Sequence, residues 1–257
     1  MFSDLIQNNM RNDMMNAIKQ DEVLGKFAGM MPNMPASDVN VSDATLYKPE
    51  YSWNYEVGSH TTLFDDKLQA DVALFYMDTR NQQISRFAES GLGRITVNAG
   101  KSRSLGAEAS VRAQLTNAFS LNGNYGYTYA TFTDYVVSET ENYNGNYVPF
   151  VPKHTFNVGA QYVFTMRKGA ILDNITVNAN YKAAGRIYWT EQNNASQALY
   201  GTLNGRVNFN KGNGQLAFWI NNALNTDYQA FYFETMNRGF AQKGRPLQVG
   251  VDIRCRF

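Results

Sequence analysis

The sequence predicts an all-β fold: an antiparallel, up-and-down meander of about nine strands that forms a segment of a transmembrane β-barrel. Three observations lead to this prediction. Apolar and polar residues alternate with a period of two, which is the period of a β-strand. Several of these runs reach the roughly 9–11 residues that cross a bilayer at a tilt. The connections between the runs are alternately short and long, as in membrane barrels.

Composition is consistent with this fold and excludes two classes of protein. The net charge is +1, so the sequence has no basic excess of the kind that nucleic-acid binding requires, and we expect no nucleic-acid partner. No run approaches the roughly 20 apolar residues of a spanning helix. The mean hydropathy of −0.42 still permits a barrel, because only alternate residues of its strands face lipid.

Residues 1–50 differ from the rest of the chain, and we expect an extracellular loop region there with a possible short helix over 4–27. The segment begins without a basic stretch followed by an apolar export signal, so we expect the chain to be a fragment of a longer protein. Six of its seven methionines could bind Cu(I), but the sequence favours a flexible apolar loop. These methionines are Met10, Met14, Met15, Met30, Met31 and Met34.

From residue 51 to residue 257 the chain is predicted to be a succession of strands. They are expected over 51–64, 67–80, 94–115, 118–132, 154–166, 174–188, 198–209, 215–231 and 246–257. The clearest alternation is in the last, whose apolar positions are Leu247, Val249, Val251, Ile253, Cys255 and Phe257. Similar alternation is found over 121–129, 156–164, 175–182 and 199–209.

The connections follow the same scheme. Short turns are expected at 65–66, 116–117, 167–173 and 210–214. Long loops are expected at 81–93, 133–153, 189–197 and 232–245. Aromatic residues are frequent near the outer ends and near the inner ends of the predicted strands, which is typical of the two aromatic girdles of a membrane barrel. Examples are Tyr51, Trp53, Tyr127 and Tyr129 at the loop ends, and Phe119, Phe164 and Phe209 at the turn ends.

Five stretches of the sequence resemble motifs of the TonB-dependent receptors of the bacterial outer membrane, in the order in which that family has them. The resemblance covers nearly all of residues 46–257. The stretches are LYKPEYSWNYEVG (46–58), NAGKSRSLGAEAS (98–110), YVPFVPKHTFNVGAQY (147–162), INNALNTDYQ (220–229) and GRPLQVGVDIRCRF (244–257).

This resemblance implies the C-terminal part of a barrel of about 22 strands, filled by an N-terminal plug domain. Such receptors are not enzymes; they import a scarce ligand, here an iron–siderophore, haem, cobalamin or a glycan. The implied partners are outer-membrane lipid, the barrel-assembly machinery, and the TonB complex acting through a plug that we expect to lie outside this chain. No cofactor is implied.

The resemblance also suggests functional residues. Aromatic and arginine side chains in the outer loops are candidates for ligand contact: Arg86, Arg94, Tyr143, Tyr147, Arg186, Tyr188, Trp189, Phe231, Tyr232 and Arg238. The last strand resembles the assembly signal of outer-membrane barrels, carried by Gly250, Ile253, Cys255 and Phe257. The alternative for this strand is an ordinary closing strand without a signalling role.

Other side chains give little sign of chemistry. The two histidines, His60 and His154, lie on different predicted strands, so we expect no metal centre. We expect Glu56 and Glu108 to pair with Arg112 or Lys182 across the barrel interior.

No catalytic motif is present in the sequence. Two other functions stay open: a small passive outer-membrane pore, and a soluble β-sandwich that binds glycans or partners.

Overall fold

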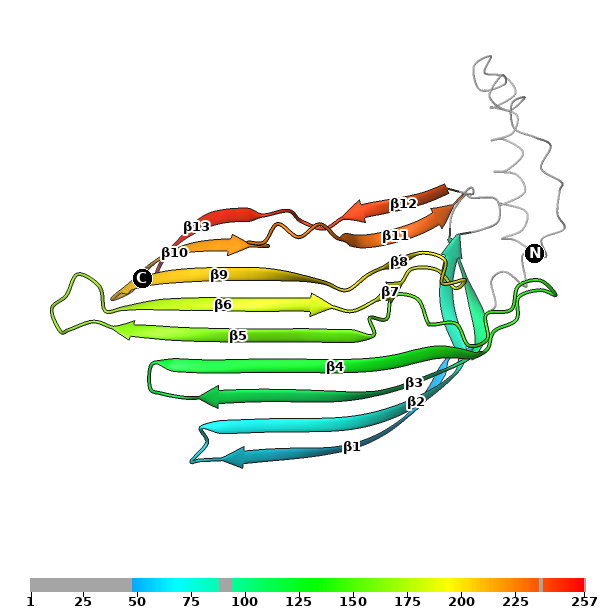
Figure 1. Cartoon of the computed structure of the whole chain (residues 1–257), viewed down its shortest axis with the longest axis horizontal. Helices are drawn as coiled ribbons and strands as arrows, with labels where there is room; N and C mark the ends of the chain where they lie inside the picture. Colours follow the sequence, from blue (N-terminus) through cyan, green and yellow to red (C-terminus); the bar gives the residue numbers. More distant parts are fainter. Residues whose placement is uncertain (1–47, 88–93, 236–237, 257) are drawn as a thin grey trace, which may run out of the picture. The chain divides into compact units, whose positions relative to one another are not determined.

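The computed structural model describes residues 48–87, 94–235 and 238–256, all of which belong to one compact unit, 47–257 (Figure 1). The side chains of residues 86, 87, 94 and 95 are outside this description. The helix expected over 4–27, the methionine cluster and Phe257 also lie outside the described residues. Within the described ranges no helix has both the length and the apolar character needed to cross a membrane.

Nine strands form one antiparallel sheet in the order β1-β2-β3-β4-β5-β6-β9-β10-β13 (Figure 1). This confirms the predicted nine-strand meander. The strands are β1 Tyr51–Leu63, β2 Leu68–Phe87, β3 Arg94–Gln114, β4 Phe119–Asp134, β5 His154–Thr165, β6 Asn174–Ala184, β9 Tyr200–Lys211, β10 Gly214–Asn221 and β13 Gln248–Cys255. Two small hairpins belong to the connections: β7 Ile187–Tyr188 with β8 Ser196–Gln197, and β11 Gln229–Thr235 with β12 Arg238–Lys243.

The register of the sheet places apolar residues of neighbouring strands on one common face. Leu216 lies opposite Ile253 and Phe218 lies opposite Val251. Along this face the side chains stay open, with Ile253 78% exposed and Val249 68% exposed. No second sheet covers this face within the described residues, which disfavours the soluble β-sandwich that the sequence left open as an alternative.

The opposite face of the sheet is polar and carries a network of side-chain hydrogen bonds; we call it the inner face. Asn210 Nδ2 donates to Asn174 Oδ1 at 2.6 Å, and Gln215 Nε2 donates to Asn210 Oδ1 at 2.9 Å. Asn180 Nδ2 donates to Asn157 Oδ1 farther along the same face. The period-two pattern therefore separates an apolar face from a hydrogen-bonded one.

Short and long connections alternate as predicted except that the β2–β3 connection, 88–93, is shorter than the β5–β6 connection, 166–173. Strand β13 runs toward the end of the sheet that carries the short turns (Figure 1). The tightest turn joins β9 to β10 through Gly212 and Asn213, where Gly212 has φ +50°. The β1–β2 turn holds Phe64, Asp65 and Asp66 at positive φ. We call the other end, which carries the long connections, the outer end.

Several strands end at positions other than those predicted. Residues 82–87 of β2 pair with 94–99 of β3, so the first half of the expected loop 81–93 continues the strand. The strand expected over 174–188 ends at Ala184, although the Gly185 N–H still donates to the His154 carbonyl at 2.7 Å, in register with the β5–β6 pairing. The strand expected over 215–231 ends at Asn221, because Asn222 adopts the left-handed conformation with φ 49°.

A small apolar core lies at the outer end. It consists of Ala99, Phe132, Tyr135 and Tyr143, with Ile84, Val137 and Val148 packed against it. Phe132 is 1% exposed. Because the cluster combines residues of β2, β3 and β4 with residues of the β4–β5 connection, it fixes that long connection onto the sheet.

Candidate functional site

A pocket of about 460 Å³ opens among the connections at the outer end. Four segments that are distant in sequence line it: 82–85 from β2, 148–150 from the β4–β5 connection, 189–192 from the β7–β8 hairpin loop, and 231–234 from β11. We call it the outer pocket. Its size is within the range of small-molecule sites.

Aromatic rings form much of the wall of the outer pocket. The Phe150 and Phe231 rings are stacked, with centroids 5.6 Å apart and planes at 16°. The Trp189 ring lies 5.6 Å from Phe150 at 59°. Phe150 has φ 64°, which is rare for an aromatic residue, and its N–H donates to the Tyr188 carbonyl at 2.8 Å. The Phe150 side chain, which lines the pocket, is 47% exposed.

Asn193 ties the loop that contains Trp189 to the β4–β5 connection. Its Oδ1 accepts the Tyr147 N–H at 2.7 Å, and its Nδ2 donates to the carbonyls of Tyr147 at 2.9 Å and Thr190 at 3.0 Å. Behind this junction the Tyr147 and Tyr188 rings stack at 5.1 Å, and Lys153 Nζ lies 3.7 Å from the Tyr147 ring centroid. Two outer connections are thus joined into one wall.

The charged side chains that line the outer pocket are acidic. Glu191 and Glu234 line it, and no Lys or Arg occurs in its lining as far as the structure describes it. Tyr232 Oη donates to Glu234 Oε1 at 2.8 Å, and this hydrogen bond to the carboxylate raises the pKa of Tyr232 above its usual value. Among the described residues, Trp189 Nε1 and Gln82 Oε1 are buried without a hydrogen-bond partner.

The structure brings only some of the predicted ligand-contact residues together. Trp189, Phe231 and Tyr232 line the outer pocket. Tyr147 and Tyr188 stack on each other but are not part of its lining. Tyr143 is 8% exposed and accepts a hydrogen bond from Gln192 Nε2 at 3.1 Å.

The predicted arginines do not line the outer pocket where their side chains are described. Arg186 Nη1 donates to Ser196 Oγ at 3.3 Å, and Arg238 is exposed at the start of β12. The side chains of Arg86 and Arg94 lie outside the described part.

Sequence reasoning missed several lining residues. Gln82 and Ser85 fell inside an expected loop and gave no pattern that marked them. Phe150 could have been found, because an aromatic residue beside Pro149 in a long outer connection is a recognisable surface feature.

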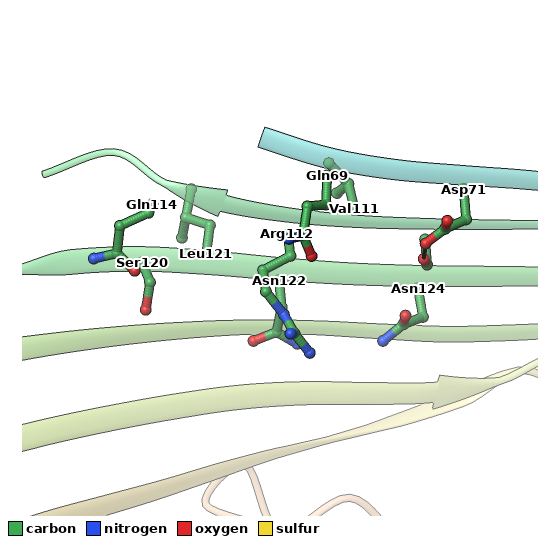
Figure 2. Close-up of a pocket in the computed structure, with 10 residues that line it drawn as sticks. Gln69, Asp71, Val111, Arg112, Gln114, Ser120, Leu121, Asn122 and Asn124 are labelled. Carbon is green, nitrogen blue, oxygen red and sulfur yellow. Dashed lines mark hydrogen bonds between the residues drawn. The ribbon is translucent and has the colours of Figure 1, made fainter. Parts of the chain in front are cut away.

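A second hollow, about 570 Å³ in volume, lies on the inner face of β2, β3 and β4. Figure 2 shows its polar side chains on these neighbouring strands, with Arg112 reaching toward Asn122. At its border Asp71 contacts the His60 ring and accepts a hydrogen bond from Ser110 Oγ at 2.7 Å. The hollow is polar and open, and it lacks the aromatic wall of the outer pocket.

The expected pairing of Glu56 and Glu108 with Arg112 or Lys182 is wrong: no such ion pair occurs among the described residues. Glu108 and Arg112 lie four residues apart on one strand, a separation of about 13 Å along β3. The inner face instead pairs Arg206 Nη1 with Asp252 Oδ2 at 2.7 Å.

The last strand presents the predicted assembly residues on both faces. Ile253 is 78% exposed and Cys255 is an exposed free thiol on the apolar face. Gly250 lies on the inner face opposite Trp219. In the described part of the chain no group of three or more His, Cys, Asp or Glu side chains could hold a metal ion.

Comparison with known proteins gives one family. The family model described as "TonB dependent receptor-like, beta-barrel" matches residues 12–223. The pesticin receptor of Yersinia pestis is 28% identical over 218 residues, covering 84% of this chain and 30% of the receptor. The ferrichrome outer membrane transporter/phage receptor of Escherichia coli is 25% identical over 206 residues, covering 78% of this chain and 26% of the transporter.

A solved structure shows the same fold. The ferric yersiniabactin uptake receptor FyuA from Yersinia pestis matches with a TM-score of 0.68 and 22% identity, over 81% of this chain and 30% of the receptor. The chain therefore spans less than a third of the length of the relatives it matches. Because the family model covers well over half of the sequence, the chain belongs to the TonB-dependent receptor-like β-barrel family of the bacterial outer membrane.

Proposed function

We propose that the whole protein, of which this chain supplies nine barrel strands, imports an iron–siderophore complex across the outer membrane. The outer pocket carries this proposal. It lies at the outer end of the sheet, where a ligand arriving from outside the cell first meets the barrel. The names of the relatives support the ligand class, since they include a ferrichrome transporter and the catecholate siderophore receptor Fiu of Escherichia coli.

The outer pocket would form one part of the ligand-binding surface. Phe150, Phe231 and Trp189 offer ring faces that bind flat organic groups of a chelate and withdraw them from water. The two connections joined by Asn193 hold the Phe150 and Trp189 rings in place before a ligand arrives, which lowers the entropy cost of binding.

The remaining partners belong to the same proposal. The apolar face of the sheet is open to lipid, and the last strand would be recognised by the barrel-assembly machinery. Energy for release of the ligand would come from the TonB complex, which acts through a plug domain in the rest of the protein.

An iron-uptake assay tests this function. The full-length gene is expressed in a strain without its own siderophore receptors, and uptake of radioactive iron is measured with ferrichrome, a ferric catecholate and a ferric phenolate. We expect saturable uptake of at least one complex, abolished when TonB is deleted. In the same assay, Phe150→Ala is expected to raise the half-saturating concentration about tenfold, because a large stacking surface is lost.

Other results would exclude the proposal. Uptake that persists without TonB would indicate the passive pore. Transport of haem, cobalamin or a glycan, without any iron chelate, would show that the ligand class is wrong. The pore is disfavoured by the order of the described sheet, in which β1 and β13 stand at opposite edges and do not pair to close a small barrel.

A further inference from the structure

We propose that the outer pocket binds an uncharged aromatic amide group of the ligand, and that it selects against a carboxylate in the same position. The inference rests on the proposed function, because it assumes that the outer pocket is a ligand site. It goes further by naming the chemical group that the outer pocket accepts.

The first observation is an unused donor. Trp189 lines the outer pocket and is 6% exposed, yet its Nε1–H has no acceptor among the described residues. Leaving a buried N–H group without an acceptor is unfavourable, so such groups are rare in native structures. A ligand oxygen would supply the missing acceptor.

The second observation is an unused acceptor in the same lining. Gln82 Oε1 is buried and receives no hydrogen bond from the described part of the chain. An amide carries both an acceptor and a donor, so one such group can satisfy Trp189 and Gln82 together. A carboxylate only accepts, and would leave Gln82 Oε1 without a donor.

The charge of the lining also disfavours a carboxylate in the outer pocket. Glu191 and Glu234 line the outer pocket, while its described lining contains no basic side chain. Of the basic side chains described near it, Lys153 Nζ lies over the Tyr147 ring and Arg186 donates to Ser196. An anionic group would therefore lose water and meet like charges without a compensating cation in the described lining.

The aromatic wall of the outer pocket favours an amide that is attached to an aromatic ring. Phe150 is 47% exposed beside Phe231 and Trp189, which leaves ring surface for a further aromatic group to cover. A flat aryl group can extend this set of rings while its amide reaches the polar atoms.

Three small aryl carbonyl probes, of which benzamide and benzoate are nearly equal in shape, test the inference. The full-length receptor, purified in detergent, is titrated with benzamide, N,N-dimethylbenzamide and benzoate by ligand-observed NMR. Benzamide has donor and acceptor, the dimethyl compound has only the acceptor, and benzoate has acceptors and a negative charge. We expect benzamide to bind at least about fivefold more tightly than either of the others.

Variants assign the effect to the two side chains. Trp189→Phe keeps a ring but removes the donor, and Gln82→Met keeps the length but removes the acceptor; each is expected to weaken benzamide binding about fivefold. Trp219→Phe is the matched control, because Trp219 lies on the inner face and its Nε1 already donates to Asp252 at 3.3 Å. Its benzamide affinity should be unchanged.

The outcomes separate this inference from the proposed function. Equal binding of benzoate and benzamide, or full affinity in both pocket variants, would overturn the inference even if iron uptake is normal. Selective benzamide binding without any iron uptake would overturn only the proposed function. If Trp189→Phe does not fold, the three probes on the unaltered protein and on Gln82→Met still decide.

Discussion

Asn222 is a single buried side chain that fixes the junction between β10 and the start of β13. It is 3% exposed and adopts φ 49°. Its Oδ1 accepts the Thr226 N–H at 2.9 Å, and its Nδ2 donates to the carbonyls of Thr226 and Arg245, each at 3.0 Å. The side chain thus supplies partners to backbone groups that no longer have a strand neighbour.

Replacing Asn222 with alanine should therefore lower the free energy of unfolding by about 2–4 kcal/mol, because three hydrogen bonds are lost and alanine is strained at this positive φ. Urea unfolding of the folded receptor in detergent measures the change. Asn221→Ala is the control, since Asn221 is exposed and its side chain makes no hydrogen bond within the described residues. A similar loss in both variants would show that the hydrogen bonds of Asn222 are not the cause.

Gly250 and Trp219 form a second residue-scale feature, on the inner face. A Cβ at position 250 would lie 2.1 Å from Trp219 Cζ2, so the indole covers the glycine of the neighbouring strand. Gly250→Ala should cost about 1–3 kcal/mol through this overlap. The double variant Gly250→Ala with Trp219→Ala should cost at least about 1 kcal/mol less than the two single changes together. Additive unfolding free energies would contradict a direct clash.

At the scale of elements, the nine strands could be predicted because one face of each repeats apolar side chains. The strand bounds at the outer end could not. In β2 the residues Gln82, Gln83 and Ser85 are polar, although β3 places Ala99 and Val97 opposite Gln82 and Ile84. Outside a hydrocarbon layer no face of a strand has to be apolar along its whole length, so the alternation that identifies a membrane strand is lost.

The outer pocket shows the corresponding limit for the functional site. Its aromatic residues Trp189, Phe231 and Tyr232 were predictable, because large rings in outer loops are uncommon without a role. Their combination with Gln82 and Phe150 was not, since it depends on how four distant segments pack together. The buried Trp189 N–H without a partner is likewise a property of packing, and no sequence pattern encodes it.

At the end of the sheet with the short turns, one carboxylate makes the stability of the fold depend on pH. Asp173, just before β6, accepts the Gly212 N–H at 2.7 Å and Lys211 Nζ at 2.9 Å, and these hydrogen bonds hold its pKa below the ordinary value of 3.8. The folded state thus favours the ionised carboxylate. The stabilisation is fully present above the unfolded pKa and is lost as pH falls below it through the folded pKa.

Asp173→Asn should consequently reduce the loss of stability between about pH 6 and pH 3, compared with the unaltered protein. The free energy of unfolding at the two pH values gives this difference. Asp65→Asn, in the β1–β2 turn, changes the net charge equally and removes no hydrogen bond within the described residues, so it serves as the control. An Asp173→Asn variant as acid-sensitive as the unaltered protein would refute the assignment.

At the scale of the whole molecule, the described sheet has two strands, β1 and β13, that each pair on one side only. Unpaired backbone groups at bilayer depth are costly, because lipid offers them no hydrogen bonds. The relatives are more than three times as long as the region they share with this chain. We therefore expect the rest of the full-length protein to supply the strands that pair with both edges.

The orientation of the sheet in the membrane follows from the same alternation and can be tested on β13. Val249 and Val251 belong to the apolar face, whereas Gln248 and Arg254 belong to the inner face. Spin labels on single cysteines at these four positions, in the full-length receptor carrying Cys255→Ser, report the surroundings of each side chain. Labels at the valines should be relaxed by oxygen, which concentrates in lipid, and the other two by a water-soluble nickel chelate.

A label at Phe240 in the outer hairpin, 45% exposed, is the control and should meet the nickel chelate in water. Nickel access to positions 249 and 251 equal to that at 248 and 254 would mean that the apolar face of the sheet does not contact hydrocarbon. That result would remove the basis for a barrel wall, because nothing else in the described residues accounts for an open row in which Val249 is 68% and Ile253 78% exposed.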